Sequence, residues 1–265
     1  MLFAATGCSF TWGQGLAYHR WLEQTKTEKI SWQDFSARYQ WPDVMHKLTN
    51  QDYIFQNSLR CAGLLAKTLK CEYLIQDENG GSNKRSFERI KVWTENHKNN
   101  PNRKLDFIIL QLTELYRDHP YTEEGSYPIC DDDCKSSEHI FCKKSPPWSS
   151  IVLDNGLSHE EFMEEFYSKD MFLELDEMCR SKGIDLLIWS WHDELARLLK
   201  DEDFFIKIKY GGKEYISFHE MERELPVSLY QDPSLPGVND EHPNKFFNQL
   251  LHDSIIEKLK DRNII

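Results

Sequence analysis

Ser9 is the residue of this sequence best placed to act as a nucleophile. It follows a short apolar run, Leu2–Thr6, and stands in a turn of small residues that begins at Gly7. A serine hydroxyl attacks a carbonyl carbon only when a base accepts its proton, and a backbone N–H at the serine can stabilise the oxyanion that forms. The same position also suits a serine that caps a helix, so the local pattern leaves both interpretations open.

A candidate base lies near the other end of the chain. His242 directly precedes the residues of a final helix, and Asp240 stands two positions before it. A carboxylate bonded to an imidazole fixes its tautomer and stabilises the imidazolium ion, as in a catalytic triad. An Asp-x-His-Pro sequence at a helix start is also typical of capping. The pair can serve Ser9 only if the fold brings the two ends of the chain together.

The alternation of strands and helices predicts such a fold. Apolar runs indicate four strands, and the longest is nearly continuous in apolar residues, as in a central strand of a parallel sheet. We expect an α/β fold with a doubly wound, mainly parallel sheet sandwiched by helices, a flavodoxin-like arrangement whose ligands bind at the carboxyl ends of the strands. The predicted strands are Leu2–Thr6, Cys71–Ile75, Leu105–Leu112 and Ile184–Trp191.

The whole chain, 1–265, is expected to form one domain. A hairpin is expected between residues 204 and 218, around Gly211-Gly212, and Pro243 is expected in the first turn of the last helix. Residues 118–155 break the strand and helix rhythm and are interpreted as an insertion over the sheet edge. Apolar residues at helical spacing predict helices around 59–69, 87–93, 162–178 and 246–259.

Three short segments resemble the dispersed motif blocks of the SGNH or GDSL-type hydrolases, in the form of divergent bacterial and phage members. The segment from Gly7 to Thr11 resembles the first block, with Cys8 where better-known members carry aspartate. Residues 79–83 resemble the second block, and residues 240–244 resemble the last. The resemblance implies that Ser9 is the nucleophile, His242 its base and Asp240 the orienting acid, with an oxyanion hole formed by Ser9, Gly80, Gly81 and Asn83.

The third block departs from the family pattern. The family offers Gly-x-Asn-Asp after the central strand, whereas here Leu112 is followed by Thr-Glu-Leu-Tyr-Arg. The family's oxyanion asparagine is therefore missing, and Asn83, Gln111 or Thr113 are the candidates to donate in its place. Gln111, Thr113 and Arg117 are also candidate substrate-binding residues. The guanidinium of Arg117 can pair with an anionic part of a substrate.

A separate pattern in the insertion offers ligands for a metal. Thiolate and imidazole side chains suit tetrahedral zinc, although their spacing does not match a zinc knuckle. Such an ion is expected to staple the insertion and to take no part in the reaction. The alternative is a polar loop that happens to hold cysteines. The candidate zinc ligands are Cys130, Cys134, His139 and Cys142.

Composition argues against several classes of partner. With 32 basic and 44 acidic side chains, the net charge of −12 repels phosphate backbones and anionic membranes, so no nucleic acid and no membrane is expected as a partner. No apolar run reaches the roughly 18 residues of a membrane span, and no signal peptide is visible, which predicts a cytoplasmic protein. The odd number of cysteines, seven, predicts reduced thiols, and oligomeric state is left open.

Together these features predict a serine hydrolase that cleaves an ester through an acyl-enzyme on Ser9. A plausible substrate is an O-acyl group on a carbohydrate or on a small polar metabolite, and catalysis needs no cofactor. Two alternatives stay open, an acyltransferase with the same triad and a non-catalytic binding protein on the same fold. Hydrolysis and transfer share the acyl-enzyme, so the sequence does not separate them.

Overall fold

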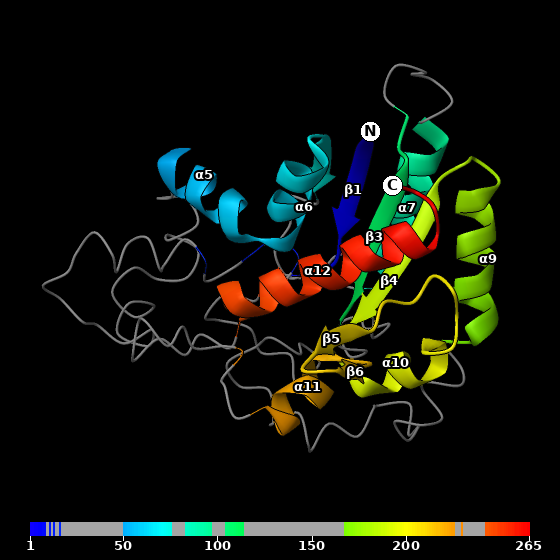
Figure 1. Cartoon of the computed structure of the whole chain (residues 1–265). Helices are drawn as coiled ribbons and strands as arrows, with labels where there is room; N and C mark the ends of the chain where they lie inside the picture. The colour runs from blue at the N-terminus through cyan, green and yellow to red at the C-terminus, as the bar shows by residue number, and fades with distance from the viewer. Residues whose placement is uncertain are drawn as a thin grey trace, which may run out of the picture.

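A parallel sheet lies at the centre of the molecule (Figure 1). The computed structural model describes residues 1–8, 11, 13, 16, 50–75, 83–96, 104–113, 167–225, 229 and 242–265. These residues form a four-stranded parallel sheet of β1 (Leu2–Thr6), β2 (Glu72–Ile75), β3 (Phe107–Leu112) and β4 (Asp185–Ser190). The strand order is β2-β1-β3-β4, so the direction of winding reverses between β1 and β3. In parallel sheets, ligands bind outside the carboxyl ends of the strands at such a reversal.

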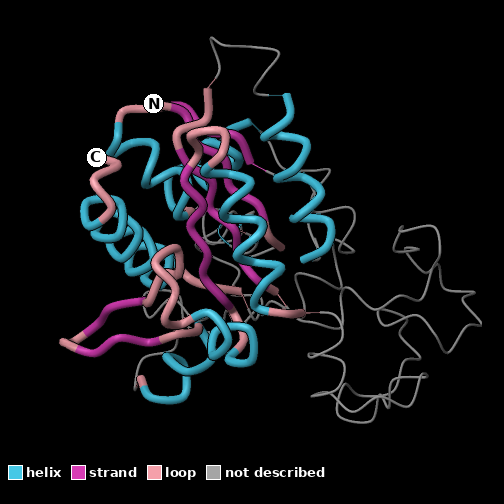
Figure 2. The backbone as a smooth tube through the Cα atoms, turned by 90° about the vertical axis from the view of Figure 1, so that its right-hand side faces the viewer, coloured by secondary structure: helices cyan, strands magenta, loops and turns pink. Residues whose placement is uncertain are grey.

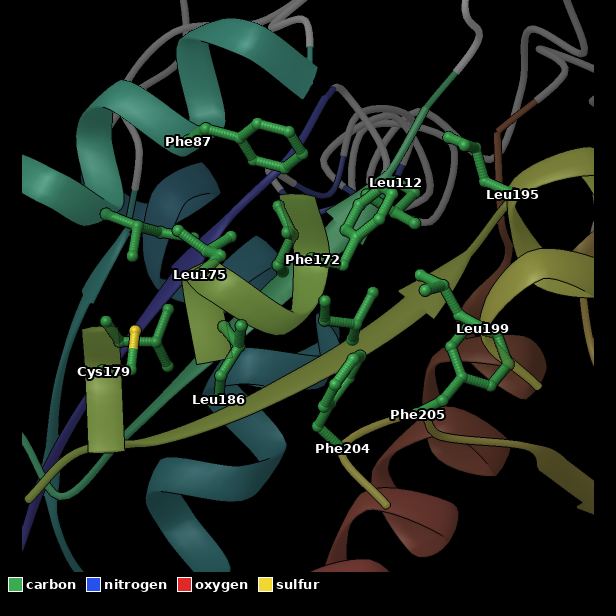
Figure 3. Close-up of a cluster of buried hydrophobic side chains, with 14 of the residues drawn as sticks. Phe87, Leu112, Phe172, Leu175, Cys179, Leu186, Leu195, Leu199, Phe204 and Phe205 are labelled. Atoms are coloured by element: carbon green, nitrogen blue, oxygen red, sulfur yellow. The ribbon is translucent and has the colours of Figure 1, made fainter. Parts of the chain in front are cut away.

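Among the described elements, three helices cover one face of the sheet. Alternate strand residues, such as Ile108 and Ile188, point to this face because side chains alternate along a strand. Figure 3 shows part of this core, where Phe87 of one helix and Phe172 of another lie over the sheet, and their ring centroids are 5.5 Å apart. The covering helices are α7 (Asn83–Asn96), α9 (Lys169–Arg180) and α10 (Asp193–Leu199).

The opposite face is covered by a second group of helices. Its core contains Phe3, Ile109 and Trp189 from the sheet and Phe247 from the last helix. Figure 2 shows the strands running between the two layers of helices. Burial on both faces explains why the strand sequences are almost continuously apolar. The helices of this second group are α5 (Asn50–Leu59), α6 (Cys61–Leu69), α11 (Phe218–Glu224) and α12 (Lys245–Asp261).

Beyond β4 the sheet continues as a short extended segment and then a hairpin. Ile188 exchanges two backbone hydrogen bonds with Phe204 and Ile206, at 2.8 and 2.7 Å, so this segment lies parallel to β4. Gly211 and Gly212 both have positive φ, +60° and +81°, which a two-residue hairpin turn requires and which glycine adopts without strain. The hairpin strands, β5 (Ile208–Tyr210) and β6 (Lys213–Tyr215), pair with each other in a sheet of their own.

The main elements agree with the sequence predictions. All four predicted parallel strands are present, with ends that differ by at most two residues, and the hairpin at Gly211 is confirmed. The predicted helix over 162–178 corresponds to α9, although residues 162–166 lie outside the described part. The insertion at 118–155 lies wholly outside it.

The placement of Pro243 in the first turn of the last helix is wrong. Helix α12 begins at Lys245, and Asn244 is its N-cap. The Asn244 side-chain oxygen accepts a hydrogen bond from the backbone N–H of Phe247 at 3.0 Å. An asparagine satisfies a free N–H of the first turn in this way, so it sets the helix start and leaves Pro243 before the cap.

Two further findings concern membranes and cysteines. Among the described helices, none has both the length and the apolar character needed to cross a membrane. The four cysteines in the described ranges, Cys8, Cys61, Cys71 and Cys179, are free thiols, as the sequence predicts.

Candidate functional site

Gln111 links the end of β3 to the segment that follows β1. Its side chain is fully buried. The Oε1 atom accepts hydrogen bonds from the backbone N–H of Thr11 at 2.9 Å and from the Thr11 hydroxyl at 2.6 Å. The Nε2 atom donates to the Sγ atom of Cys8 at 3.0 Å. One amide side chain therefore holds the residues on either side of position 9, where the sequence places the nucleophile.

Gly7 has no side chain because there is no room for one. A Cβ atom at this position would lie 2.4 Å from the Thr11 hydroxyl oxygen and 2.7 Å from the Cβ of Gln111. A Cβ atom essentially never lies this close to a non-bonded heavy atom, so any other residue would push the turn away from β3. The Gly7 and Gln111 positions thus specify the same close approach of the two strand ends.

Asn83, at the start of the helix α7, binds the main chain at the end of β3. It is fully buried. Its Oδ1 atom accepts from the backbone N–H of Thr113 at 2.8 Å, while Nδ2 donates to the Thr113 carbonyl oxygen at 3.2 Å and to the Tyr167 hydroxyl at 3.4 Å. The amide therefore pairs with both backbone groups of Thr113, as a neighbouring strand would.

From the sequence alone, Asn83 could also be a turn residue that tolerates a positive φ. This interpretation is wrong, because Asn83 is helical and its φ is not positive. The bonds from its side chain to Thr113 hold the first described residue of α7 against the end of β3. Both polar atoms of its amide are engaged within the protein.

Thr113 differs from its neighbours in this cluster. Its side chain is only 1% exposed, and its hydroxyl has no hydrogen-bond partner in the described part of the chain. Close by, the Thr6 hydroxyl donates to the Ser86 hydroxyl at 3.3 Å. The carboxyl ends of β1 and β3 are thus lined with buried, uncharged polar groups, of which the Thr113 hydroxyl is unsatisfied.

His242 is half-buried just before α12, and the residues that follow it are firmly held. The Nδ2 atom of Asn248 donates to the carbonyl oxygens of Pro243 and Asn244, at 3.3 and 2.9 Å. The Oδ1 atom of Asn248 accepts from the backbone N–H of Cys61 at 2.9 Å. The first turn of α12, and with it the segment after His242, is therefore fixed against the start of α6.

A small cavity joins the two segments that carry Ser9 and His242 in the sequence. Its volume is about 20 Å³, enough for about one water molecule. Thr11, two residues after position 9, and Pro243, directly after His242, both line it. The fold thus brings together segments from opposite ends of the chain. The remaining lining residues are Ala5, Cys61, Ala62, Ile109, Trp189, Phe247, Asn248 and Leu251.

Cys61 is the cysteine in the wall of this cavity. Burial, with a smaller contribution from the negative charge of Asp253, raises the pKa of its thiol far above the ordinary value. A thiol acts as a nucleophile only as the thiolate, and such a pKa keeps it protonated at neutral pH. Cys61 is therefore a packing residue and no alternative to a serine nucleophile.

A second polar cluster lies at the carboxyl end of β4. Asp193, at the start of α10, accepts hydrogen bonds from the Ser217 hydroxyl and the Arg223 guanidinium, and Arg197 lies 3.5 Å away. Burial by itself raises the pKa of Asp193, but the bonds from Ser217 and Arg223 outweigh it, so the pKa lies below its ordinary value. Both carboxylate oxygens are bonded and the charge is compensated.

Aromatic rings gather beside this second cluster. The ring centroids of His192 and His219 are 4.3 Å apart, and Trp191 lies 4.8 and 5.5 Å from the two. The backbone N–H of Trp191 donates to the carbonyl oxygen of Leu112 at 3.1 Å, which places these rings next to the end of β3. His192 is the N-cap of α10, without a side-chain cap bond.

Several predicted site residues lie outside the described part of the chain. Within the described ranges, no group of three or more His, Cys, Asp or Glu side chains is arranged to hold a metal ion. The predicted residues outside those ranges are Ser9, Gly80, Gly81, Arg117 and Asp240, with the candidate zinc ligands Cys130, Cys134, His139 and Cys142.

Sequence reasoning missed the cluster around Asp193 altogether. Ser217 and Arg223 come from a different helix, and no local motif announces the contact. For Gln111 a signal existed, since a polar residue inside an apolar strand needs a buried partner. Searches with the chain find no matching family model, no similar curated protein and no similar solved structure.

Proposed function

We propose that the chain is a serine ester hydrolase of the SGNH or GDSL type, with Ser9 as nucleophile, His242 as base and Asp240 as the group that orients it. The observation that carries the proposal is that Thr11 and Pro243 line the same cavity. These residues neighbour Ser9 and His242 in the sequence, and a triad requires that their segments meet.

The sheet order adds support. The segments that resemble the first two family blocks follow β1 and β2, the position of the third block follows β3, and these strands are adjacent in the order β2-β1-β3. Ser9, Gly80 with Gly81, and Thr113 therefore belong to neighbouring strand ends. A flavodoxin-like, doubly wound fold of the SGNH type has its ligand site at this reversal of strand order.

The proposed reaction proceeds in two steps through an acyl-enzyme. The Ser9 oxygen attacks the carbonyl carbon of the ester while His242 accepts the hydroxyl proton, and the bond to the alcohol breaks as His242 returns that proton to the leaving oxygen. Water then attacks the acyl-serine in the same way and releases the acid. Backbone N–H groups of Ser9 and of Gly80 or Gly81 stabilise the oxyanion.

Asn83 and Gln111 receive supporting roles in this proposal. Their side-chain amides are already bonded within the protein, to Thr113 and Tyr167 in one case and to Cys8 and Thr11 in the other. Asn83 can donate to an oxyanion only by giving up one of these bonds. Gln111 holds the residues on both sides of Ser9 and so positions the nucleophile.

The substrate class proposed is an O-acyl ester of a carbohydrate or another small polar alcohol. Acyl transfer to a second alcohol uses the same groups, with that alcohol in place of water. The four zinc candidates from Cys130 to Cys142 belong to the proposal only as a structural staple of the insertion. Zinc content per chain, measured on protein purified without added metal, tests that part separately.

Steady-state hydrolysis of p-nitrophenyl acetate tests the proposal. Ser9→Ala and His242→Ala should each lower kcat by about 10³ or more, and the double variant should be little worse than either, because the groups act as a unit. Ser181→Ala, which removes an exposed serine at the end of α9, serves as the matched control and should keep full activity. Full activity in Ser9→Ala would show that the mechanism is wrong.

A further inference from the structure

The unsatisfied hydroxyl of Thr113 is the least expected feature at the reversal of strand order. Its oxygen is buried, and it has no hydrogen-bond partner among the residues that the structure describes. Leaving a buried hydroxyl unbonded destabilises a protein, so such groups are rare and need an explanation. A valine has the same shape without this penalty. The threonine therefore points to a partner that the described residues do not supply.

The main chain at Thr113 is held in place by hydrogen bonds on two sides. Thr113 directly follows β3 and is bonded at both backbone groups to Asn83. On its other side, the carbonyl oxygen of Leu112 accepts a hydrogen bond from the backbone of Trp191 at 3.1 Å. The main chain at Thr113 is thus fixed from two directions, which is the rigidity that a preorganised hydrogen-bond donor needs.

The neighbouring amides are already bonded within the protein. The two Nδ2 hydrogens of Asn83 are matched by the Thr113 carbonyl and the Tyr167 hydroxyl, and the Nε2 atom of Gln111 donates one of its two hydrogens to Cys8. Of the three side chains considered as replacements for the missing third-block asparagine, Thr113 alone has a side-chain polar atom that makes no hydrogen bond to the described residues.

We infer that the Thr113 hydroxyl donates a hydrogen bond to the oxygen of the reacting acyl group and completes the oxyanion hole. This inference rests on the proposed function. In the absence of substrate the hydroxyl pays a desolvation penalty, and as negative charge develops on the acyl oxygen the bond strengthens. A donor held in a site without bulk water acts mainly on the transition state, so its loss lowers kcat more than it raises KM.

Opposite effects on stability and activity give the test. Thr113→Val replaces the hydroxyl with a methyl group of similar size, so the melting temperature should stay the same or rise, while kcat for p-nitrophenyl acetate should fall about 10²-fold with little change in KM. Thr113→Ser keeps the hydroxyl and should retain kcat within a few-fold. A purely structural role for the hydroxyl would instead lower the melting temperature of Thr113→Val.

The outcomes separate this inference from the proposed function. If Ser9→Ala is inactive and Thr113→Val retains full kcat, the inference on Thr113 is overturned and the proposed function stands. If Ser9→Ala is fully active, both fail together. Should Thr113→Val not fold, Thr113→Ala also lacks the hydroxyl, and its kcat is compared with that of Thr113→Ser. Equal kcat values in that pair would overturn the inference as well.

Discussion

Two polar clusters occupy the same edge of the parallel sheet, and they are built in opposite ways. The β3 cluster, made of Cys8, Thr11, Asn83, Gln111 and Thr113, contains no charge and leaves one buried hydroxyl unbonded. The β4 cluster, made of Asp193, Arg197, Ser217 and Arg223, contains a carboxylate with both oxygens bonded. Buried polarity at the sheet edge is common to both.

The difference teaches which of the two clusters is available for a ligand. In the β4 cluster the carboxylate of Asp193 is bonded and its charge is compensated by arginines, so the cluster serves to join α10 to α11. In the β3 cluster the amides of Asn83 and Gln111 hold two strand ends together, and the rigidly held hydroxyl of Thr113 is left as a hydrogen-bond donor. The β3 cluster is the better candidate for a ligand site because one of its own members, Thr113, has a buried hydroxyl without a described partner, whereas the four residues of the β4 cluster are bonded to one another.

The largest effect in this comparison is expected for Gln111→Leu. The substitution leaves Thr11 and Cys8 without their partners, so we expect a loss of about 3 kcal/mol in the free energy of unfolding. Because the residues flanking Ser9 also lose their support, ester hydrolysis should fall by about 10²-fold or more even where the protein is folded. Urea unfolding and kinetics on the same sample measure both effects.

Gln249→Leu is the matched control for Gln111→Leu. Gln249 lies on the exposed side of α12 and bonds only to neighbours on that helix. Its replacement should change the free energy of unfolding by no more than about 0.5 kcal/mol and leave kcat unchanged. Equal effects of the two glutamine variants would remove the special role of Gln111.

A smaller effect, on stability alone, is expected for Asp193→Asn. The substitution removes a buried charge that Ser217 and Arg223 are arranged to bond, and should lower the free energy of unfolding by about 2 kcal/mol at pH 7. Because the β4 cluster is a structural network, kcat should stay unchanged below the melting temperature. A large loss of kcat in well-folded Asp193→Asn protein would break the comparison.

The pH dependence of the Asp193→Asn effect has a defined sign. The pKa of Asp193 in the folded protein lies below its ordinary value of 3.8, so folding favours the ionised form. Its stabilisation is therefore fully present above that ordinary value and is lost as the pH falls through the lower folded-state pKa. The stability difference between native protein and Asp193→Asn should shrink on acidification. A difference that grows below pH 4 would contradict this assignment.

The smallest effect is expected for Arg197→Ala. The Arg197 side chain is 68% exposed and lies 3.5 Å from the Asp193 carboxylate, so solvent screens most of the attraction. Exposed ion pairs of this kind contribute about 0–1 kcal/mol, and we expect a change of about 0.5 kcal/mol or less in thermal unfolding. A loss as large as that of Asp193→Asn would show that the network depends on Arg197 as much as on Arg223.

The sequence predicted the fold better than it predicted the site. Continuous apolar runs identify β3 and β4 because both faces of the sheet are buried, and that property is written along the chain itself. The bond between Gln111 and Thr11 joins residues far apart in the chain, and no periodicity encodes it. The same holds for Asn83 and Thr113. Local patterns named these residues but did not say which would be bonded and which left unsatisfied.

The central claim, that Ser9 is the nucleophile of a site at the ends of β1 and β3, is tested most directly by covalent labelling. A fluorophosphonate probe reacts with an activated serine, and mass spectrometry of the digested protein identifies the modified peptide. Native protein should carry one adduct, on the peptide containing Ser9, and Ser9→Ala should carry none. Unlabelled native protein, or equal labelling of native protein and Ser9→Ala on another serine, would contradict the claim.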